Sequence, residues 1–311
     1  MMKFTVTLVM LLFSLSVFGK KLYKFKDENG NWSFTDRSPN TEAEVTVKQL
    51  DVQNKQLIFL LKSGDSQQPD YYFHNDYAGP VEIEVKFVNK VNVLSFPDLP
   101  SRFVVKNGKS DTVFRVRSAD SSRPWEYKLE YNSVVGYPMK HYFSDEGYLP
   151  PIEPNKSFQV AQAFGGEFSH TDKENKYAVD ITMPVGTPIF AARDGQVMSV
   201  DSDFYKNGID KKYLSKANNI RILHDDGSMA LYAHLELEKL EVYPGLKVRA
   251  GKLIGYSGNT GYSSGPHLHF VVQYNRGMEL VSTPFKFFNK NGQLEEPIVG
   301  KMLVGISTNL D

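Results

Sequence analysis

Short apolar runs with a period of two, separated by turns rich in glycine and proline, extend through most of this 311-residue chain. Side chains alternate between the two faces of an extended strand, so each run can bury one face and leave the other polar. The runs at 56–61, 81–88, 111–116 and 125–131 predict an antiparallel, immunoglobulin-like β-sandwich over residues 45–143. Residues 155–288 repeat the pattern, and we predict a second, mostly antiparallel β domain there. The predicted fold class is therefore mostly β.

The remaining segments have compositions of their own. Residues 1–19 carry one charge, Lys3, before an apolar run that ends at Gly19, which is the layout of a secretory signal peptide. The run is shorter than the ~20 residues of a spanning helix, so cleavage is favoured over an uncleaved anchor. Residues 20–44 alternate aromatic side chains around an Asp-Glu-Asn-Gly turn and predict a small β-hairpin module with a linker. The proline-containing segment 144–154 is interpreted as a second linker, and 289–311 as a C-terminal tail.

Composition excludes several classes of protein. The chain has no cysteine, so disulfides, a thiol nucleophile and a lipid-modified cysteine after the apolar run are all excluded. Its 36 basic residues balance 36 acidic ones, and no basic cluster of the kind that follows a phosphate backbone is present. We expect no nucleic-acid partner and no stable membrane span once the signal is removed.

A glycine-rich loop leads into a pair of histidines. Residues 258–266 read G-N-T-G-Y-S-S-G-P and are followed by His267-Leu268-His269. If this segment is a strand, the two imidazoles share one face. Imidazole is the commonest metal ligand and a general base near neutral pH. Such a pair alone fits an ordinary strand surface equally well, so the interpretation depends on polar residues elsewhere.

Three further residues supply those groups: His170, Asp180 and His234. A catalytic zinc ion takes three nitrogen or oxygen ligands from the protein and keeps one position open. We predict that His170, Asp180 and His269 are the metal ligands. His234 and His267 then remain for catalytic proton transfer, with no basis in the sequence for dividing the roles between them.

The region 148–286 resembles the lysostaphin-type (LytM-domain) zinc endopeptidases of bacterial cell walls. The resemblance is carried by Asp180, by Tyr232 with His234 in a Y-x-H motif, by the loop 258–266 and by the H-L-H that follows it. It implies a metallopeptidase domain with one zinc ion in a groove and peptidoglycan as substrate. The N-terminal hairpin resembles a module of exported proteobacterial proteins and so suggests a Gram-negative source. For a peptidase of this family from such a source, we expect a periplasmic location and cleavage of the D-alanyl to diaminopimelate cross-link rather than a glycine bridge.

One position departs from the family pattern. Family members hold their first histidine four residues before the aspartate, where this chain has Lys176. We expect residues 171–176 to loop out and leave His170 as the ligand. The alternative is a degenerate, catalytically inactive regulator that binds and activates a cell-wall amidase.

The other predictions concern the surroundings of the site. Loops 169–176, 201–218, 236–244 and 258–266 are expected to form the walls of the groove. His224 is expected to flank the site or cap a hairpin, and His74 and His141 to have no part in it. The sandwich is expected to bind the wall, dock a wall-associated protein or cover the groove, with a plain spacer as the alternative. An adhesion or scaffold protein would leave the histidines unexplained.

Overall fold

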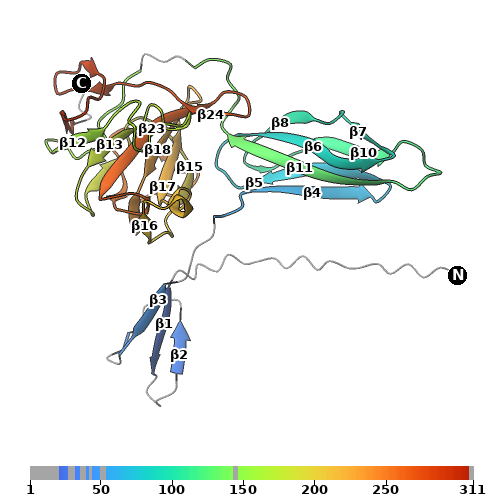
Figure 1. The fold of residues 1–311 in the computed structure, drawn as a ribbon, viewed down its shortest axis with the longest axis horizontal. Helices are drawn as coiled ribbons and strands as arrows, with labels where there is room; N and C mark the ends of the chain where they lie inside the picture. The colour runs from blue at the N-terminus through green and yellow to red at the C-terminus, as the bar shows by residue number, and fades with distance from the viewer. Residues whose placement is uncertain are drawn as a thin grey trace. The chain divides into compact units, whose positions relative to one another are not determined.

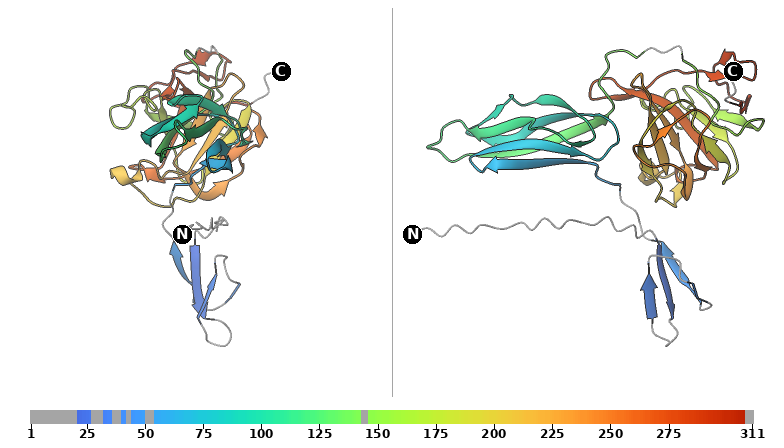
Figure 2. Two further views of the ribbon diagram at one scale, coloured as in Figure 1. Left: turned by 90° about the vertical axis from the view of Figure 1, so that its right-hand side faces the viewer. Right: turned by 180° about the vertical axis from the view of Figure 1, so that it is seen from behind.

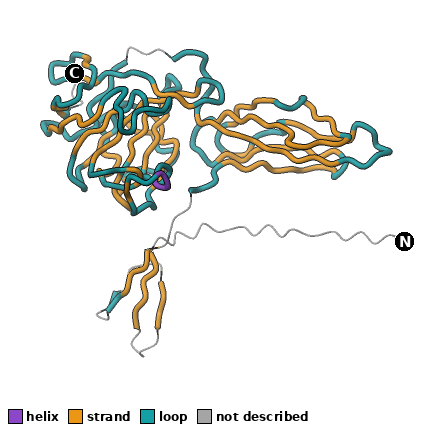
Figure 3. Tube along the Cα trace, in the orientation of Figure 1, coloured by secondary structure: helices purple, strands orange, loops and turns teal. Residues whose placement is uncertain are grey.

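The computed structural model describes residues 21–26, 32–35, 40–41, 44–49, 54–142 and 146–307. The chain divides into two compact units, residues 1–53 and 54–311, and the ribbon is drawn in Figure 1. Strands dominate both units, as Figure 3 shows, and the mostly β prediction is confirmed. The only helix in the described ranges is a 3-10 turn at Lys211–Tyr213, far too short to cross a membrane. The predicted signal peptide lies outside the described residues.

The first unit is a three-stranded antiparallel sheet. Its strand order is β2-β1-β3, with β1 at Lys21–Lys26, β2 at Trp32–Thr35 and β3 at Thr46–Gln49. The β1–β2 pair brings together the two segments on either side of the Asp-Glu-Asn-Gly turn, as their alternating pattern predicts. The turn itself lies outside the described residues.

A sandwich of two antiparallel sheets opens the second unit. One sheet has the order β4-β5-β10-β7, with β9 paired to β5, and the other has the order β11-β6-β8. The first consists of β4 (Ile58–Asp65), β5 (Gln68–Asn75), β7 (Val93–Phe96), β9 (Gly108–Lys109) and β10 (Phe114–Ser118). The second consists of β6 (Val81–Val91), β8 (Ser101–Val105) and β11 (Glu126–Val135). Alternate residues of β6 fill the core between the sheets: Val81, Ile83 and Val85 are fully buried. The immunoglobulin-like classification stays a prediction.

A nine-stranded sheet forms the rest of the unit and positions the site. Its order is β20-β15-β17-β18-β23-β13-β12-β27, with β24 paired to β23. Figure 2 shows the ribbon from two further sides. Its strands are β12 (Ser157–Gln162), β13 (Val179–Thr182), β15 (Gly195–Asp201), β17 (Asn219–Leu223), β18 (Met229–Ala233), β20 (Lys247–Val248), β23 (His267–Asn275), β24 (Leu280–Ser282) and β27 (Met302–Val304). One face of this sheet packs on the core, which includes Ile181, Ile222 and Phe270. The opposite face carries the polar residues described below.

Smaller sheets cover the core. A three-stranded sheet has the order β14-β21-β19, and the pairs β16–β22 and β25–β26 lie outside it. These strands are β14 (Pro188–Phe190), β16 (Asn207–Gly208), β19 (Leu235–Leu240), β21 (Leu253–Ser257), β22 (Gly261–Tyr262), β25 (Phe287–Phe288) and β26 (Leu294–Glu295). Ile189, Leu235 and Ile254 from the three-stranded sheet join the same core as Phe270.

Both ends of the peptidase region are built into it. Tyr148 and Ile152, from the predicted linker 144–154, are buried in the core, and the Tyr148 N–H donates to the Lys286 carbonyl at 2.9 Å. The predicted tail contributes β27, which pairs antiparallel with β12. The prolines and acidic residues of 144–154 suggested a linker, but the apolar residues between them pack into the domain.

The sandwich packs on one end of the nine-stranded sheet. Met198 and Met229 of the sheet are buried in the core of the sandwich. Glu82 of β6 accepts hydrogen bonds from Asn275 Nδ2 at 2.9 Å and from the Met278 N–H at 2.7 Å. The contact thus combines buried apolar side chains with a buried carboxylate that spans the two sheets.

Replacing Glu82 with alanine is expected to destabilise the second unit by about 3 kcal/mol, because it leaves one buried and one partly buried donor without their charged acceptor. The matched control is Glu84→Ala, two residues along the same strand, whose carboxylate accepts from an exposed Arg102 at 2.8 Å. That pair is expected to contribute at most ~1 kcal/mol. Chemical denaturation of both variants measures the difference, and equal losses would contradict the interface.

Candidate active site

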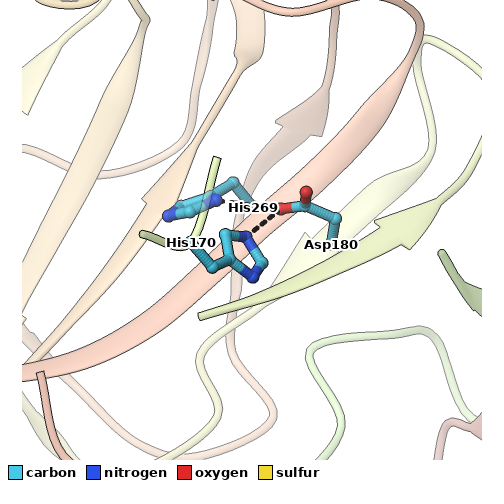
Figure 4. A group of neighbouring side chains, drawn as sticks. All are labelled: His170, Asp180 and His269. Carbon is cyan, nitrogen blue, oxygen red and sulfur yellow. Dashed lines mark hydrogen bonds and ion pairs between the residues drawn. The ribbon is translucent and has the colours of Figure 1, made fainter. Parts of the chain in front are cut away.

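His170, Asp180 and His269 meet on the exposed face of the nine-stranded sheet. One possible ligand atom from each lies within 4.8 Å of the others, and all three residues are buried (Figure 4). His170 follows β12 in the chain, whereas Asp180 and His269 are register partners on β13 and β23. Lys176 is exposed, and its ammonium lies 5.4 Å from the centre of the Tyr177 ring. The structure therefore brings together the three predicted ligands and leaves Lys176 outside the cluster.

The imidazole of His170 has a fixed orientation. Its Nδ1 lies 2.9 Å from the Ala163 carbonyl oxygen, which only accepts, so Nδ1 carries a proton. In a neutral ring, Nε2 then has a free lone pair, and this atom lies 3.2 Å from Asp180 Oδ1. Two lone pairs face each other across that gap, and only a proton or a metal cation between them makes the contact favourable.

His269 presents a second lone pair to the same oxygen. Asn175 Nδ2 donates to both carboxylate oxygens of Asp172, at 3.1 and 3.2 Å, which directs the amide oxygen of Asn175 toward His269 Nε2 at 3.1 Å. Nε2 therefore donates, and Nδ1 of the neutral ring faces Asp180 Oδ1 at 2.9 Å. Hydrogen bonds that fix the second nitrogen of a histidine are typical of metal ligands.

Asp180 supplies the negative charge of the cluster. Burial opposes its ionisation, but with a proton in each gap the hydrogen bonds that His170 and His269 donate hold the pKa of its carboxyl group well below the usual range. Its other oxygen, Oδ2, accepts from Gln162 Nε2 at 3.1 Å. A carboxylate and two imidazole nitrogens that converge in this way form a donor set suited to zinc.

His234 and His267 lie beside this cluster. Their rings are 4.5 Å apart, and His267 Nε2 is 3.8 Å from Asp180 Oδ1. Nδ1 of His234 donates to the Thr260 carbonyl at 2.6 Å, and Nδ1 of His267 donates to the Gly265 carbonyl at 2.8 Å. Burial lowers the pKa of both imidazoles, in His234 to about 3. Each is therefore a neutral ring whose Nε2 can accept a proton.

The backbone of His234 is in the left-handed region, with φ at 63°. Strand alternation places Tyr232 in the core, and continued alternation would send His234 to the same side. The positive φ at the end of β18 turns the ring instead toward His267. A non-glycine residue in this conformation is strained, and such strain concentrates at functional sites.

A groove of about 800 Å³ is lined by Asp180, His234, His267 and His269, while His170 is buried beside Asp180 and does not line it. Three of the predicted walls line it, through residues of 169–176, 201–218 and 258–266. Phe168 and Tyr262 extend these walls and stack with their ring centres 5.8 Å apart. The prediction for 236–244 is wrong, since no residue of that segment lines the groove. Its alternating residues instead form most of β19, which pairs with β21 in the three-stranded sheet.

Sequence reasoning missed the residues that hold the polar groups in place. These are Gln162 against Asp180, Asn175 against His269 and the Thr260 carbonyl against His234. Asn175 belongs to the segment interpreted as a looped-out insertion, so its contact is not visible from spacing. Thr260 stands out in the sequence only as part of the glycine-rich loop, yet its carbonyl lies 2.6 Å from His234 Nδ1.

The remaining histidines lie outside the groove. His74 pairs with Asp76 at 2.8 Å on the sandwich, and neither His74 nor His141 lines the groove. His224 is buried in the hairpin between β17 and β18, where its Nδ1 donates to the Asp194 carbonyl at 2.6 Å. Burial lowers the pKa of His224 to about 4. This residue belongs to the structure of the hairpin rather than to the site.

His224 is expected to make stability depend on pH. Its pKa is near 6.5 when unfolded and about 4 when folded, so the unfolded state gains its proton first and stability falls as pH drops from about 6.5 to 4. Between pH 7.5 and 5 this loss is about 2 kcal/mol. His224→Asn, which can keep the donor to Asp194, is expected to remove that part of the dependence. Denaturation of both proteins at the two pH values tests this, and equal pH dependence would contradict it.

Residues 174–280 match Peptidase family M23. The match includes Asp180, His234, His267 and His269, which all lie around one groove. This domain belongs to the lysostaphin-type peptidase family. Residues 9–56 match a separate family, described as a domain of unknown function, DUF4124.

Curated relatives of the lysostaphin-type domain come from several bacteria. The chain is 40% identical over 101 residues to the glycyl-glycine endopeptidase ALE-1 of Staphylococcus capitis, which covers 32% of this chain and 25% of the relative. It is 38% identical over 93 residues to the peptidoglycan DD-endopeptidase ShyA of Vibrio cholerae, covering 30% and 19%. It is 33% identical over 128 residues to the DD-carboxypeptidase/endopeptidase Mpg of Neisseria meningitidis, covering 40% and 26%. The chain thus spans about a quarter or less of the length of these relatives.

Solved structures also match part of the chain. The catalytic domain of lysostaphin from Staphylococcus simulans is 27% identical, with a TM-score of 0.28, and the match covers 46% of this chain and 89% of that domain.

Proposed function

We propose that the protein is an exported zinc metalloendopeptidase that hydrolyses the peptide cross-links of peptidoglycan. The observation that carries the proposal is the convergence of two imidazole lone pairs and a carboxylate oxygen at the base of a groove, with two further neutral imidazoles beside them. The proposed ligands are His170 Nε2, Asp180 Oδ1 and His269 Nδ1. Bound there, zinc would supply Lewis-acid activation of a water molecule and of the scissile carbonyl.

The residues of this chain have separate tasks in the reaction. Nε2 of His234 and Nε2 of His267 are the atoms free to accept a proton from the attacking water, because both Nδ1 atoms are engaged with carbonyls. Once protonated, either imidazole can donate to the developing oxyanion or return the proton to the leaving amine. The two rings pack against each other with centres 4.5 Å apart, which fixes their positions beside the proposed metal ligands.

The substrate assignment rests on chemistry and on the relatives. The groove is open and lined by aromatic and polar side chains, which suits an extended peptide better than a small metabolite. The relatives named above include peptidoglycan and glycyl-glycine endopeptidases. We infer that the bond cut is the D-alanyl to diaminopimelate cross-link and that the protein acts in the periplasm, after removal of residues 1–19.

The sandwich fits a positioning role better than an occluding one. None of the sandwich residues that the structure describes lines the groove around Asp180 and His269. It packs instead on Met198 and Met229, farther along the same sheet. We infer that it orients the peptidase domain on the wall or on a wall-associated protein, without covering the metal ligands.

The second candidate is an inactive regulator of a cell-wall amidase. Lys176 at the position of the first ligand motivates this candidate, but His170 lies beside Asp180 and His269, and the other four polar groups line one groove. The test is the zinc content of the purified protein together with digestion of purified sacculi, followed by mass analysis of the fragments. Stoichiometric zinc and newly freed stem peptides are expected. Intact sacculi in the presence of bound zinc would favour the regulator.

A further inference from the structure

The groove continues along the sheet toward the sandwich. A second hollow of about 880 Å³ shares part of its lining with the first and is bounded at its far end by Tyr77 and residues 133–135 of the sandwich. The strand register gives the order of the residues that form the floor between the two hollows. Ala233 pairs with both His269 and Asn219, and the next row on the same face joins Leu231 to Val271 and Arg221. Arg221 therefore lies between the histidine cluster and the sandwich, and it lines both hollows.

Arg221 is a partly buried cation with an incomplete set of partners. Its Nη1 donates to Gln273 Oε1 at 2.7 Å. Among the described residues no carboxylate oxygen lies within 4 Å of its guanidinium, which has five N–H donors. Gln273 is 1% exposed, and its Nε2 donates to the Glu174 carbonyl at 2.8 Å, which directs Oε1 at the arginine. A buried amide thus holds the guanidinium in place without neutralising it.

The acidic groups near Arg221 compensate its charge only in part. Glu174 and Asp201 face it from neighbouring segments beyond ion-pair distance, and burial raises the pKa of both carboxyl groups. Burial also lowers the pKa of Arg221, since a charge removed from water lacks its hydration. Tyr77 from the sandwich completes the surroundings. A cation in this state gains from pairing with an anion that enters the groove.

We propose that Arg221, held by Gln273, binds a free carboxylate of the peptide substrate. The proposal rests on the proposed function and specifies its substrate: a cross-linked peptide with an ionised carboxylate on one side of the scissile bond. Two strand spacings and two residues of rise separate the Cα atoms of Arg221 and His269 by roughly 12 Å. This is the length of three or four residues of extended peptide. A planar guanidinium matches a carboxylate through two parallel hydrogen bonds, which a neutral amide cannot reproduce.

The test uses synthetic cross-linked stem-peptide dimers in which each free carboxylate is converted to its amide, one at a time. With the full chain and bound zinc, one such amidation is expected to lower kcat/KM by about 10- to 100-fold, the effect of one charge-assisted pair. Arg221→Gln is expected to lower kcat/KM on the parent dimer by a similar factor and to make the enzyme indifferent to that amidation. The two changes form a double-mutant cycle, and additive losses would overturn the proposal.

Gln273→Glu provides a second variant that keeps the arginine. A carboxylate in place of the amide would pair with the guanidinium internally and compete with the substrate. The same loss of carboxylate preference is expected, with unchanged zinc content. A variant that retained full preference would contradict the proposal, even if Arg221→Gln failed to fold.

Failure of this subsite differs from failure of the proposed function. If the native protein cleaves every dimer equally well, the peptidase assignment stands and the Arg221 subsite is wrong. If it cleaves none, the proposed function is wrong, and the subsite is then judged by calorimetric binding of the separate half-dimers, acid and amide forms alike. Equal affinity for the two forms, in the native protein and in Arg221→Gln, would overturn the subsite on its own.

Discussion

Replacing His170 with alanine is expected to remove the bound zinc and to abolish peptide hydrolysis. His170 Nε2 is one of three atoms that converge on a single point, and a site with only Asp180 and His269 left has too few protein ligands to hold zinc firmly. The loss in metal affinity is expected to exceed 100-fold, since changes to the outer partners of metal ligands alone cost 10- to 100-fold. Metal analysis of the dialysed protein and a peptide cleavage assay measure both effects.

Lys176→Ala is the matched control for this variant. Lys176 occupies the position that the family pattern gives to the first ligand, but its side chain is exposed and lies over Tyr177. The control is expected to retain zinc and activity. Full zinc content in His170→Ala, or its loss in Lys176→Ala, would mean that residues 171–176 do not loop out as we propose.

His234→Ala and His267→Ala are expected to separate catalysis from metal binding. Neither residue belongs to the three-atom cluster, and both present a free Nε2 beside it. Each variant is expected to keep close to one zinc ion per chain and to lose on the order of 10²-fold or more in kcat. His74→Ala, which removes an imidazole on the sandwich, is the control and is expected to change neither quantity.

The ratio of zinc to protein decides how these two variants are interpreted. If His267→Ala lost its zinc, His267 would be a metal ligand. This variant is the more informative of the two, because His267 Nε2 lies only 3.8 Å from Asp180 Oδ1. If both variants kept their full rate, proton transfer would have to come from another group in the groove.

Strand periodicity accounts for what the sequence predicted about the site. His267 and His269 share a face because β23 alternates, and Leu268 and Phe270 fill the core on the other side. Ligand chemistry and a looped-out segment 171–176 predict His170 beside Asp180, although the family spacing points to Lys176, and the two side chains lie 3.2 Å apart. These inferences needed only local geometry and a count of possible ligands.

Other features depend on contacts between distant parts of the chain. The direction of the His234 ring follows from a single positive φ. Strand alternation alone would place this ring on the core side of the sheet. Asn175 reaches His269 across 94 positions of sequence, and its side chain in a polar loop gives no signal of that role. Met198 and Met229 lie on strands of the nine-stranded sheet but are buried in the core of the sandwich. Long-range packing of this kind leaves no periodic pattern in a single sequence.

The C-terminal strand also affects how the molecule behaves in solution. The nine-stranded sheet ends in β20, of two residues, on one side and in β27, of three residues, on the other. Short edge strands offer few unpaired N–H and C=O groups to the sheet of another molecule. A chain shortened before residue 302 would lose β27 and expose β12, the strand that carries Gln162 beside Asp180. The tail therefore protects the protein from association edge to edge at the side of the sheet nearest its proposed metal ligands.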